Sequence, residues 1–330
     1  CGRCGGAGRR SRDRAQMPRR PGPPSAVQLD PTPPPRLVLA REHPKAHLAA
    51  LERTGAVMRL RRGAYLPATT LDTVPEHAAP RLEQLGRTAA VARQLERATL
   101  SHTSAALWWG LPVVTSSQAV HVVQPHRASS RSAKDIRRHS LELAPEHVTE
   151  HHGVRVTTLE RTVVDCATLL RVEPALILAD AALHAGADLA VCREILGSLG
   201  SRRGTARARA VLEHADGGAE SPGETRTRLL VLRAGLPAPV TQVPVTLPAT
   251  TYWADLGWPE LRVLLEYDGV SKYTANGAAA DAVLAEKYRE EAIARAGFRV
   301  VRVTRSDLRA GGHLVARLRR LADFGPAVPR

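Results

Sequence analysis

The stretch Thr251–Gly269, TYWADLGWPELRVLLEYDG, decides the fold of the C-terminal part of this chain. Its apolar residues form two short runs, Thr251–Leu256 and Arg262–Glu266, which are typical of β-strands. Gly257-Trp258-Pro259 lies between the runs and is typical of a turn. The stretch therefore predicts a β-hairpin.

Three acidic residues, Asp255, Glu266 and Asp268, lie at the ends of these two strands. The hairpin returns the chain beside itself, so Asp255 and Glu266 are expected to approach each other. Glu266 and Asp268 are two positions apart and share a face if the strand persists. Converging carboxylates repel one another unless a cation lies between them, and hard oxygen ligands favour Mg²⁺ or Mn²⁺ over zinc.

The elements around this hairpin predict a complete α/β domain over residues 217–325. The predicted order is α-β-β-β-α-β-α with a mixed sheet. Besides the hairpin, the expected elements are helix Ser221–Ala234, strand Val240–Leu247, helix Asp281–Ala296, strand Phe298–Thr304, and helix Leu308–Ala322 with Ser306 as its cap.

Three further regions precede this domain. Residues 1–36 are basic and proline-rich, which predicts a disordered tail in which Met17 is a candidate start of the natural chain. Residues 37–75 predict the second half of a winged helix, with a helix at Ala46–Thr54 and a hairpin through Arg61-Arg62-Gly63. Residues 76–216 are predicted to be mainly helical, with short strands at Ala119–Val123 and Val154–Val156.

The chain has a formal net charge of +15, which favours polyanionic partners and DNA first. An arginine-rich surface that reflects genomic base composition is the alternative. Two basic segments are candidates for contact with the phosphate backbone. They are the wing of the hairpin and the loop His126–His139, which supply Arg59, Arg61, Arg62, Arg127, Arg131, Lys134, Arg137 and Arg138.

Three runs near the C-terminus carry a family resemblance: ESPGETRTRLLVLRAGLPAPVTQVPV, ADLGWPELRVLLEYDG and KYREEAIARAGFRVVRVTRSDL. They resemble the domain-of-unknown-function family 559, which is related to the very-short-patch mismatch repair endonuclease. That family belongs to the PD-(D/E)xK superfamily, which includes restriction endonucleases. The resemblance covers roughly residues 218–322 and implies a restriction-endonuclease-like fold, a mixed sheet flanked by helices.

The resemblance also implies a site. In the superfamily a helix acid and two strand positions build a magnesium site, which places the metal on Glu224, Asp255 and Glu266 of this chain. A lysine normally follows two residues after the last acid, and here that position is Asp268. The substitution removes the ammonium group that would polarise the attacking water.

Lys287 and Arg289, on the helix after the loop, are candidates to supply the missing positive charge. The alternative for both is a solvated helix face paired with Glu286, Glu290 and Glu291. Glu224 also has an alternative: it is an acid in the first turn of a helix and lies four residues before Arg228.

The middle region resembles a second family through LRRGAYLP, SHTSAALWWGLP and VTTLERTVVDCATLL. These runs look like actinobacterial type IV toxin–antitoxin AbiEi-like antitoxins, whose winged helix implies promoter binding and whose partner is a toxin protein. The winged helix of this chain is truncated. Arg161-Thr162 and Asp165 resemble the motif of that family, and helix capping and an intrahelical pair explain them equally well.

Other side chains carry little signal for a site. The four cysteines do not form a disulfide framework, which favours a reducing cytoplasm. No run is long and apolar enough to predict a membrane span. The histidines are scattered, and His102 and the pair His151-His152 lack a partner at metal-binding spacing. We therefore expect surface or capping roles for them.

Three functions follow as hypotheses. The first is a DNA-associated, cytoplasmic protein whose C-terminal domain hydrolyses DNA phosphodiester bonds with Mg²⁺ or Mn²⁺. The second is a non-enzymatic antitoxin or transcriptional regulator, with DNA or a cognate toxin bound by a degenerate nuclease fold. The third is a structural scaffold.

Overall fold

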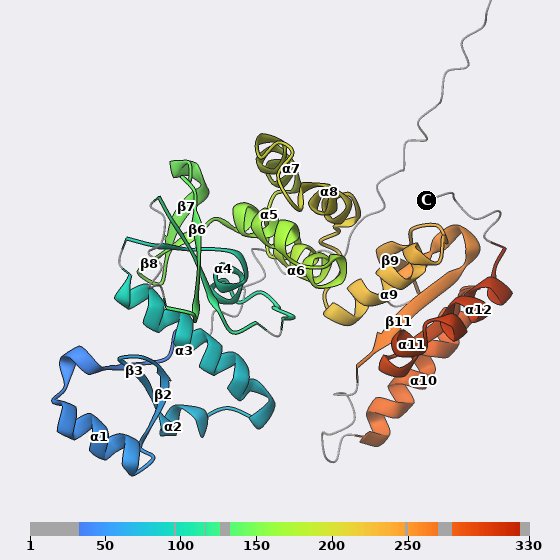
Figure 1. The fold of residues 1–330 in the computed structure, drawn as a ribbon. Coiled ribbons are helices and arrows are strands. Elements are labelled where there is room, and N and C mark those ends of the chain that lie inside the picture. Colours follow the sequence, from blue (N-terminus) through green and yellow to red (C-terminus); the bar gives the residue numbers. More distant parts are fainter. Residues whose placement is uncertain are drawn as a thin grey trace, which may run out of the picture.

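The computed structural model describes residues 33–95, 97–115, 117–125, 133–247, 250–269 and 279–323, with 279–285 described by their backbone only. The chain has a mixed α+β fold, as the sequence predicts. Figure 1 shows three parts along the molecule, with α1 at one end, α5 to α8 in the middle and α10 to α12 at the other end. Most of the predicted disordered tail lies outside the described residues.

The first part is a small sheet with strand order β1-β3-β2. The predicted helix and hairpin are both present, and β1 is a strand that the sequence pattern did not predict. Gly63 turns the hairpin with a φ of 77°, a conformation that glycine adopts without steric cost. The elements are β1 (Val38–Leu39), α1 (Lys45–Arg53), β2 (Val57–Arg61), β3 (Ala64–Pro67) and α2 (Ala68–Leu71).

The second part contains a five-stranded sheet of order β6-β5-β4-β8-β7. The sequence predicts only two of these strands, β5 and β8. Helices α3 and α4 pack on it through an apolar cluster that includes Leu85, Leu107 and Val122. These elements are α3 (Ala79–Gln94), β4 (Thr99–Leu100), α4 (His102–Trp108), β5 (Val120–Gln124), β6 (Ile136–Ser140), β7 (Val148–His151) and β8 (Val154–Thr157).

Strand β6 corrects the loop predicted over 126–139, of which 126–132 lie outside the described residues. The sequence IRRHS carries almost no apolar pattern, so periodicity cannot identify it. The strand forms because it pairs in parallel with the buried β5 at the edge of the sheet.

Four helices follow and pack around a second core that includes Val164, Leu176 and Leu212. Thr158 caps the first of them, with its side chain accepting from the backbone N–H of Arg161 at 3.3 Å. The helices are α5 (Leu159–Leu169), α6 (Val172–His184), α7 (Leu189–Ser198) and α8 (Thr205–His214), in the region predicted to be mainly helical.

The third part is a four-stranded mixed sheet of order β12-β11-β10-β9. Helices α9 and α12 cover one face through Val231 and Leu314, and α10 covers the other through Ile293. The elements are α9 (Pro222–Arg233), β9 (Val240–Thr246), β10 (Thr251–Trp258), β11 (Val263–Asp268), α10 (Ala279–Arg295), β12 (Arg299–Thr304), α11 (Arg305–Ala310) and α12 (Gly312–Leu321).

Two local predictions are wrong in this part. Gly257 and Trp258 belong to β10, and the turn is a 3-10 helix, Pro259–Leu261, closed by Arg262 at a φ of 53°. The last helix is two helices separated at Gly311, and Thr304 rather than Ser306 caps the first of them. Thr304 and Asp307 form a reciprocal capping box, which satisfies two backbone N–H groups at once.

A buried carboxylate joins the second and third parts. Asp180 on α6 is 1% exposed, and its Oδ2 accepts from Arg228 Nη2 at 2.6 Å and from Thr225 Oγ1 at 2.9 Å, both on α9. Its Oδ1 accepts from the backbone N–H of Asp216 at 2.8 Å. Arg228 also donates to the carbonyl of His214. The network therefore fixes α9 against α6.

We predict that Asp180→Ala lowers the free energy of unfolding by about 3–5 kcal/mol, because it leaves the Arg228 guanidinium buried without its counterion. Urea unfolding at neutral pH measures this. The control is Glu173→Ala, which removes the half-exposed ion pair to Arg226 between the same two helices and should cost less than about 1 kcal/mol. Equal losses for the two variants would contradict the role given to Asp180.

Candidate functional site

The sheet of the third part forks where the predicted acids lie. Strands β10 and β11 pair through Leu256↔Leu265, Gly257↔Leu264 and Trp258↔Val263, and not beyond. From there β10 continues along β9 to Thr251, and β11 continues along β12 to Asp268. Asp255 and Glu266 are therefore the first residues past the last pair.

Asp255 is held inside this fork. Its Oδ2 accepts from the backbone N–H of Tyr267 at 2.8 Å, so the carboxylate replaces the strand partner that Tyr267 loses there. The side chain is therefore fixed by the sheet itself.

Glu224 approaches the fork from α9. Ser221 caps this helix, and Glu224 Oε2 accepts from the backbone N–H of Glu220 at 2.8 Å. The side chain is 6% exposed, and burial, together with the charge of Asp255, raises the pKa of its carboxyl to about 7. The alternative pairing of Glu224 with Arg228 is wrong, because Arg228 binds Asp180.

Glu266 is tied to an aromatic and a cationic side chain. The hydroxyl of Tyr252 donates to Glu266 Oε1, and burial and this hydrogen bond raise the pKa of that phenol. The guanidinium of Arg289 lies 4.9 Å from the centre of the Tyr252 ring. Arg289 also pairs with Glu286, while Lys287 is exposed and has no ion pair within the described part of the chain.

Asp268 belongs to a different contact. Its Oδ2 lies 3.7 Å from Arg302 Nη1, and Arg302 also pairs with Glu286 and Glu290 on α10. The structure thus brings Glu224 to Asp255, Glu266 to Tyr252, and Asp268 to Arg302. The carboxylates of Glu224, Asp255 and Glu266 are not among the described groups whose ligand atoms all lie within 4.8 Å of one another.

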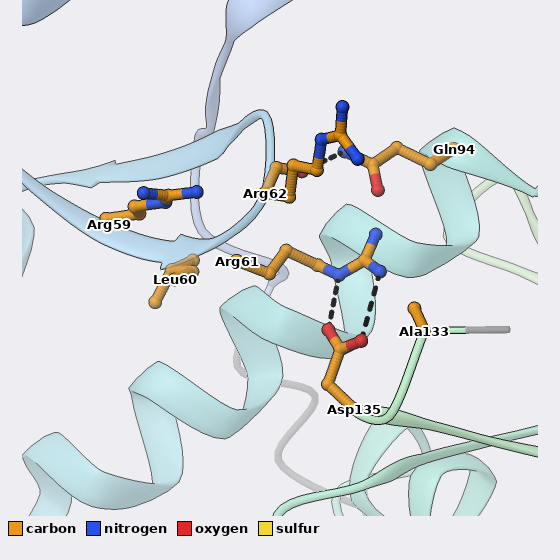
Figure 2. Close-up of a pocket in the computed structure, with 7 residues that line it drawn as sticks. All are labelled: Arg59, Leu60, Arg61, Arg62, Gln94, Ala133 and Asp135. Carbon is orange, nitrogen blue, oxygen red and sulfur yellow. Dashed lines mark hydrogen bonds and ion pairs between the residues drawn. The ribbon is translucent and has the colours of Figure 1, made fainter. Parts of the chain in front are cut away.

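The two basic segments predicted to contact DNA meet in space. A hollow of about 510 Å³ lies between the wing of β2 and β3 and the chain before β6 (Figure 2). It is lined by Arg59, Leu60, Arg61, Arg62, Gln94, Ala133 and Asp135. Residues some 70 positions apart in the sequence therefore form one surface, as the 74-residue separation of Arg61 and Asp135 shows.

The basic residues of this surface differ in what they can bind. Arg61 donates to both oxygens of Asp135, at 2.8 and 3.4 Å, and this contact lowers the pKa of the Asp135 carboxyl (Figure 2). Arg59 and Arg62 are exposed and have no ion pair among the described residues. Lys134 and Arg137 are exposed, Arg138 is half-buried, and Arg127 and Arg131 lie outside the described residues.

One group of side chains was missed in the sequence. His102 on α4, His121 on β5 and His139 on β6 offer ring nitrogens that all lie within 4.8 Å of one another. The surface or capping role predicted for His102 is therefore wrong, since His102 and His121 are 7% and 5% exposed. The signal was absent locally, because the three residues are 19 and 18 positions apart and β6 was not recognised.

Burial keeps these three imidazoles neutral near pH 7. It lowers the pKa of His102 and His139, and it lowers that of His121 to about 4, with the neighbouring His139 adding to the effect on the other two. Neutral imidazole is the form that binds metals.

We predict a pH-dependent stability that Glu224 controls in metal-free protein. Its pKa rises from 4.5 to about 7 on folding, so the folded state holds the proton more tightly. The contribution of Glu224 to the free energy of unfolding is therefore fully present below about pH 4.5. It is lost as the pH rises from about 4.5 to about 7, by up to about 3 kcal/mol. Glu224→Gln should remove this fall, as measured by urea unfolding in EDTA across that range.

The matched control is Glu260→Gln, an exposed acid in the turn of the same domain, which should leave the pH profile unchanged. Parallel profiles for wild type and Glu224→Gln would show that Glu224 is not the group that titrates.

No protein-family model matches this chain. Two uncharacterized proteins of Mycobacterium tuberculosis, from strains CDC 1551 / Oshkosh and H37Rv, are each 32% identical to it over 165 residues. The match covers 49% of this chain and 59% of each relative, so the chain spans well under two thirds of their length. Their names state no activity. None of the described helices is long and apolar enough to cross a membrane.

Proposed function

We propose that this protein is DNA-associated and that its C-terminal part hydrolyses DNA phosphodiester bonds with the help of a divalent metal. One observation carries the proposal: Glu224 is buried beside Asp255 at a fork of the sheet, and among the described residues no cationic side chain forms an ion pair with Glu224. A buried carboxylate without a counterion is costly unless it is protonated or binds a cation.

The donor set fits Mg²⁺ or Mn²⁺. Glu224 and Asp255 offer hard carboxylate oxygens, and in the described part of the chain no cysteine or histidine forms a metal-ligand group with them. Glu224 and Asp255 would hold the ion, and Glu266 on β11 would join them by turning its carboxylate away from Tyr252. When bound, such an ion lowers the pKa of a water ligand and neutralises charge on the phosphate.

Neighbouring residues would position the two strand carboxylates, and an arginine would contact the DNA. Asp255 is positioned through its hydrogen bond with the backbone N–H of Tyr267, and Glu266 through that with Tyr252. Arg289, which lies over Tyr252, is better placed than Lys287 to supply the positive charge that Asp268 does not. We assign it contact with a phosphate oxygen, a role that suits the planar guanidinium.

The basic hollow between the first and second parts supports the DNA-binding half of the proposal. Arg59 and Arg62 are exposed on the wing and line the hollow, and Lys134 and Arg137 are exposed on or next to β6. Unpaired basic side chains bind the phosphate backbone without regard to sequence.

A regulator remains the alternative function, as an AbiEi-like antitoxin that binds DNA or a cognate toxin. The pairing of Asp268 with Arg302 favours it, because a strand position that carries lysine in active nucleases is here part of an internal ion-pair network. This alternative needs the same basic surface and no hydrolysis.

We predict that the full chain with Mg²⁺ or Mn²⁺ nicks supercoiled DNA, and that Asp255→Asn and Glu224→Gln reduce nicking by at least about 100-fold, since both remove a ligand oxygen. Gel assays on supercoiled, linear and mismatched DNA measure this. Arg289→Lys should keep part of the activity that Arg289→Ala loses.

Glu260→Gln is the control and should cleave like wild type. Equal nicking by wild type, Asp255→Asn and Glu224→Gln would exclude the proposed site. No cleavage by any form, together with salt-sensitive DNA binding, would favour the regulator.

We predict a separate effect on DNA binding for the wing. Arg59→Ala and Arg62→Ala together should reduce the slope of log K against log salt by about 1–2, because each removes up to one phosphate contact. Fluorescence anisotropy over a salt series measures the slope. Arg61→Ala should instead lower stability, since Arg61 already binds Asp135. An unchanged slope in the double variant would remove the wing from the DNA interface.

A further inference from the structure

Three histidines from separate elements converge in the second part of the molecule. His121 Nδ1 lies 3.0 Å from His139 Nε2, and the rings of His102 and His139 stack with their centres 3.8 Å apart. In a tetrahedral zinc site with Zn–N bonds of about 2.0–2.1 Å, two ligand nitrogens are about 3.3 Å apart. The nitrogens of His121 and His139 are therefore within a few tenths of an ångström of ligand spacing.

The sheet fixes two of the three rings. Strands β5 and β6 pair in parallel with His121 opposite Arg137 and Val123 opposite His139, so the two histidines are diagonal neighbours that share a face. Ser104 Oγ also accepts from the backbone N–H of His121 at 2.8 Å, which ties β5 to α4. The rings converge because the register of the sheet and the start of α4 place them together.

A buried carboxylate lies behind the third ring. His102 Nδ1 is 3.0 Å from Ser101 Oγ and 4.0 Å from Asp165 Oδ2. That oxygen is buried and has no hydrogen-bond partner among the described residues, although Asp165 Oδ1 accepts from Arg161 Nε at 2.8 Å. A carboxylate behind the outer nitrogen of a histidine is the usual arrangement around a ligating imidazole, since it fixes the tautomer and strengthens the donor.

The backbone of His102 is held in an unfavourable conformation. Its φ is 49°, in the left-handed region that costs a residue with a Cβ about 1–2 kcal/mol. His102 is the first residue of α4, directly after the N-cap Ser101. Its backbone conformation sets the direction from which its ring approaches His121 and His139. Such strain persists where the surroundings fix it, and it gathers at ligand sites.

We propose that His102, His121 and His139 bind one Zn²⁺ ion, with Asp165 as the residue that positions His102. Imidazole nitrogen is a ligand that zinc prefers and that Mg²⁺ does not. Three protein ligands leave one position of a tetrahedral ion for water or a further donor. Because the rings of His102 and His139 stack nearly parallel, one of them must rotate for all three nitrogens to face the ion.

The site is independent of the proposed nuclease chemistry. It lies on α4, β5 and β6, whereas Glu224 and Asp255 lie on α9 and β10. The two sites also differ in donor chemistry, since one offers imidazole nitrogens and the other carboxylate oxygens. Failure of one proposal therefore leaves the other untouched.

The experiment uses the full chain, stripped with EDTA and titrated with Zn²⁺ by calorimetry, and with Co²⁺ followed by visible absorption. We expect one equivalent of Zn²⁺ with submicromolar affinity, and the intense visible bands of a four-coordinate Co²⁺ ion. X-ray absorption should show three imidazole nitrogens at about 2.0–2.1 Å.

Three variants test the ligands. His121→Ala and His139→Gln should weaken Zn²⁺ binding by at least about 100-fold, and Asp165→Asn by about 10–100-fold. His139 is only half-buried, so its variant keeps the test open if His121→Ala does not fold, which circular dichroism establishes. His151→Gln is the matched control, a half-buried histidine of the same sheet in the pair His151-His152, and should bind like wild type.

Glu224→Gln should also bind Zn²⁺ like wild type, which separates this ion from the one proposed at the sheet fork. Folded wild-type protein that binds no stoichiometric Zn²⁺ would overturn the proposal and leave a hydrogen-bonded histidine cluster. Unchanged Zn²⁺ affinity in His139→Gln and His121→Ala would overturn it as well.

Discussion

The buried carboxylate of Asp180 is the contact on which the arrangement of this molecule depends. It lies on α6 and receives hydrogen bonds from Arg228 and Thr225 on α9 and from the backbone of Asp216 in the connection between the helical layer and the C-terminal sheet. A charge this deeply buried is tolerated only with good geometry and with its oxygens satisfied. Both oxygens are satisfied here, so α9 has one favourable position against α6 (Figure 1).

The position of α9 in turn sets the candidate metal site. Gly223, one residue before Glu224, packs so closely on Tyr267 that a Cβ there would lie 2.0 Å from its ring carbon Cε1. Tyr267 is also the residue whose backbone N–H binds Asp255. One short stretch of β11 therefore receives both the helix that carries Glu224 and the carboxylate of the neighbouring strand. Glycine is needed at 223 because any side chain would separate the two.

Local pattern predicted the elements well and the partners of charged residues poorly. Helices α9 and α10 lie within two residues of their predicted bounds, and the Arg161–Asp165 pair lies four residues apart on one helix, as expected. The interpretation of Arg228 as a partner of Glu224 used the same rule and failed, because Asp180 is 48 residues away in sequence. The sequence did not predict the histidine group for the same reason, because His121 and His139 come together only when β5 and β6 pair. Tertiary contacts of this kind leave no local periodicity.

The position of Asp268 sharpens the distinction between the acids at the fork. Arg302 lies within ion-pair distance of Asp268, Glu286 and Glu290, so these three carboxylates share a cation that the chain provides. Glu224 is more buried than any of these three. The charged group that raises its pKa most is another carboxylate, Asp255. Among the described residues, the partly exposed acids thus have an arginine partner, whereas Glu224 has no ion pair and would need a proton or an external cation for compensation. If Asp268 were lysine, its ammonium group would compensate that end of the fork directly. With aspartate there, Arg302 pairs with Asp268, and the guanidinium of Arg289 on Tyr252 is the candidate for a replacement cation.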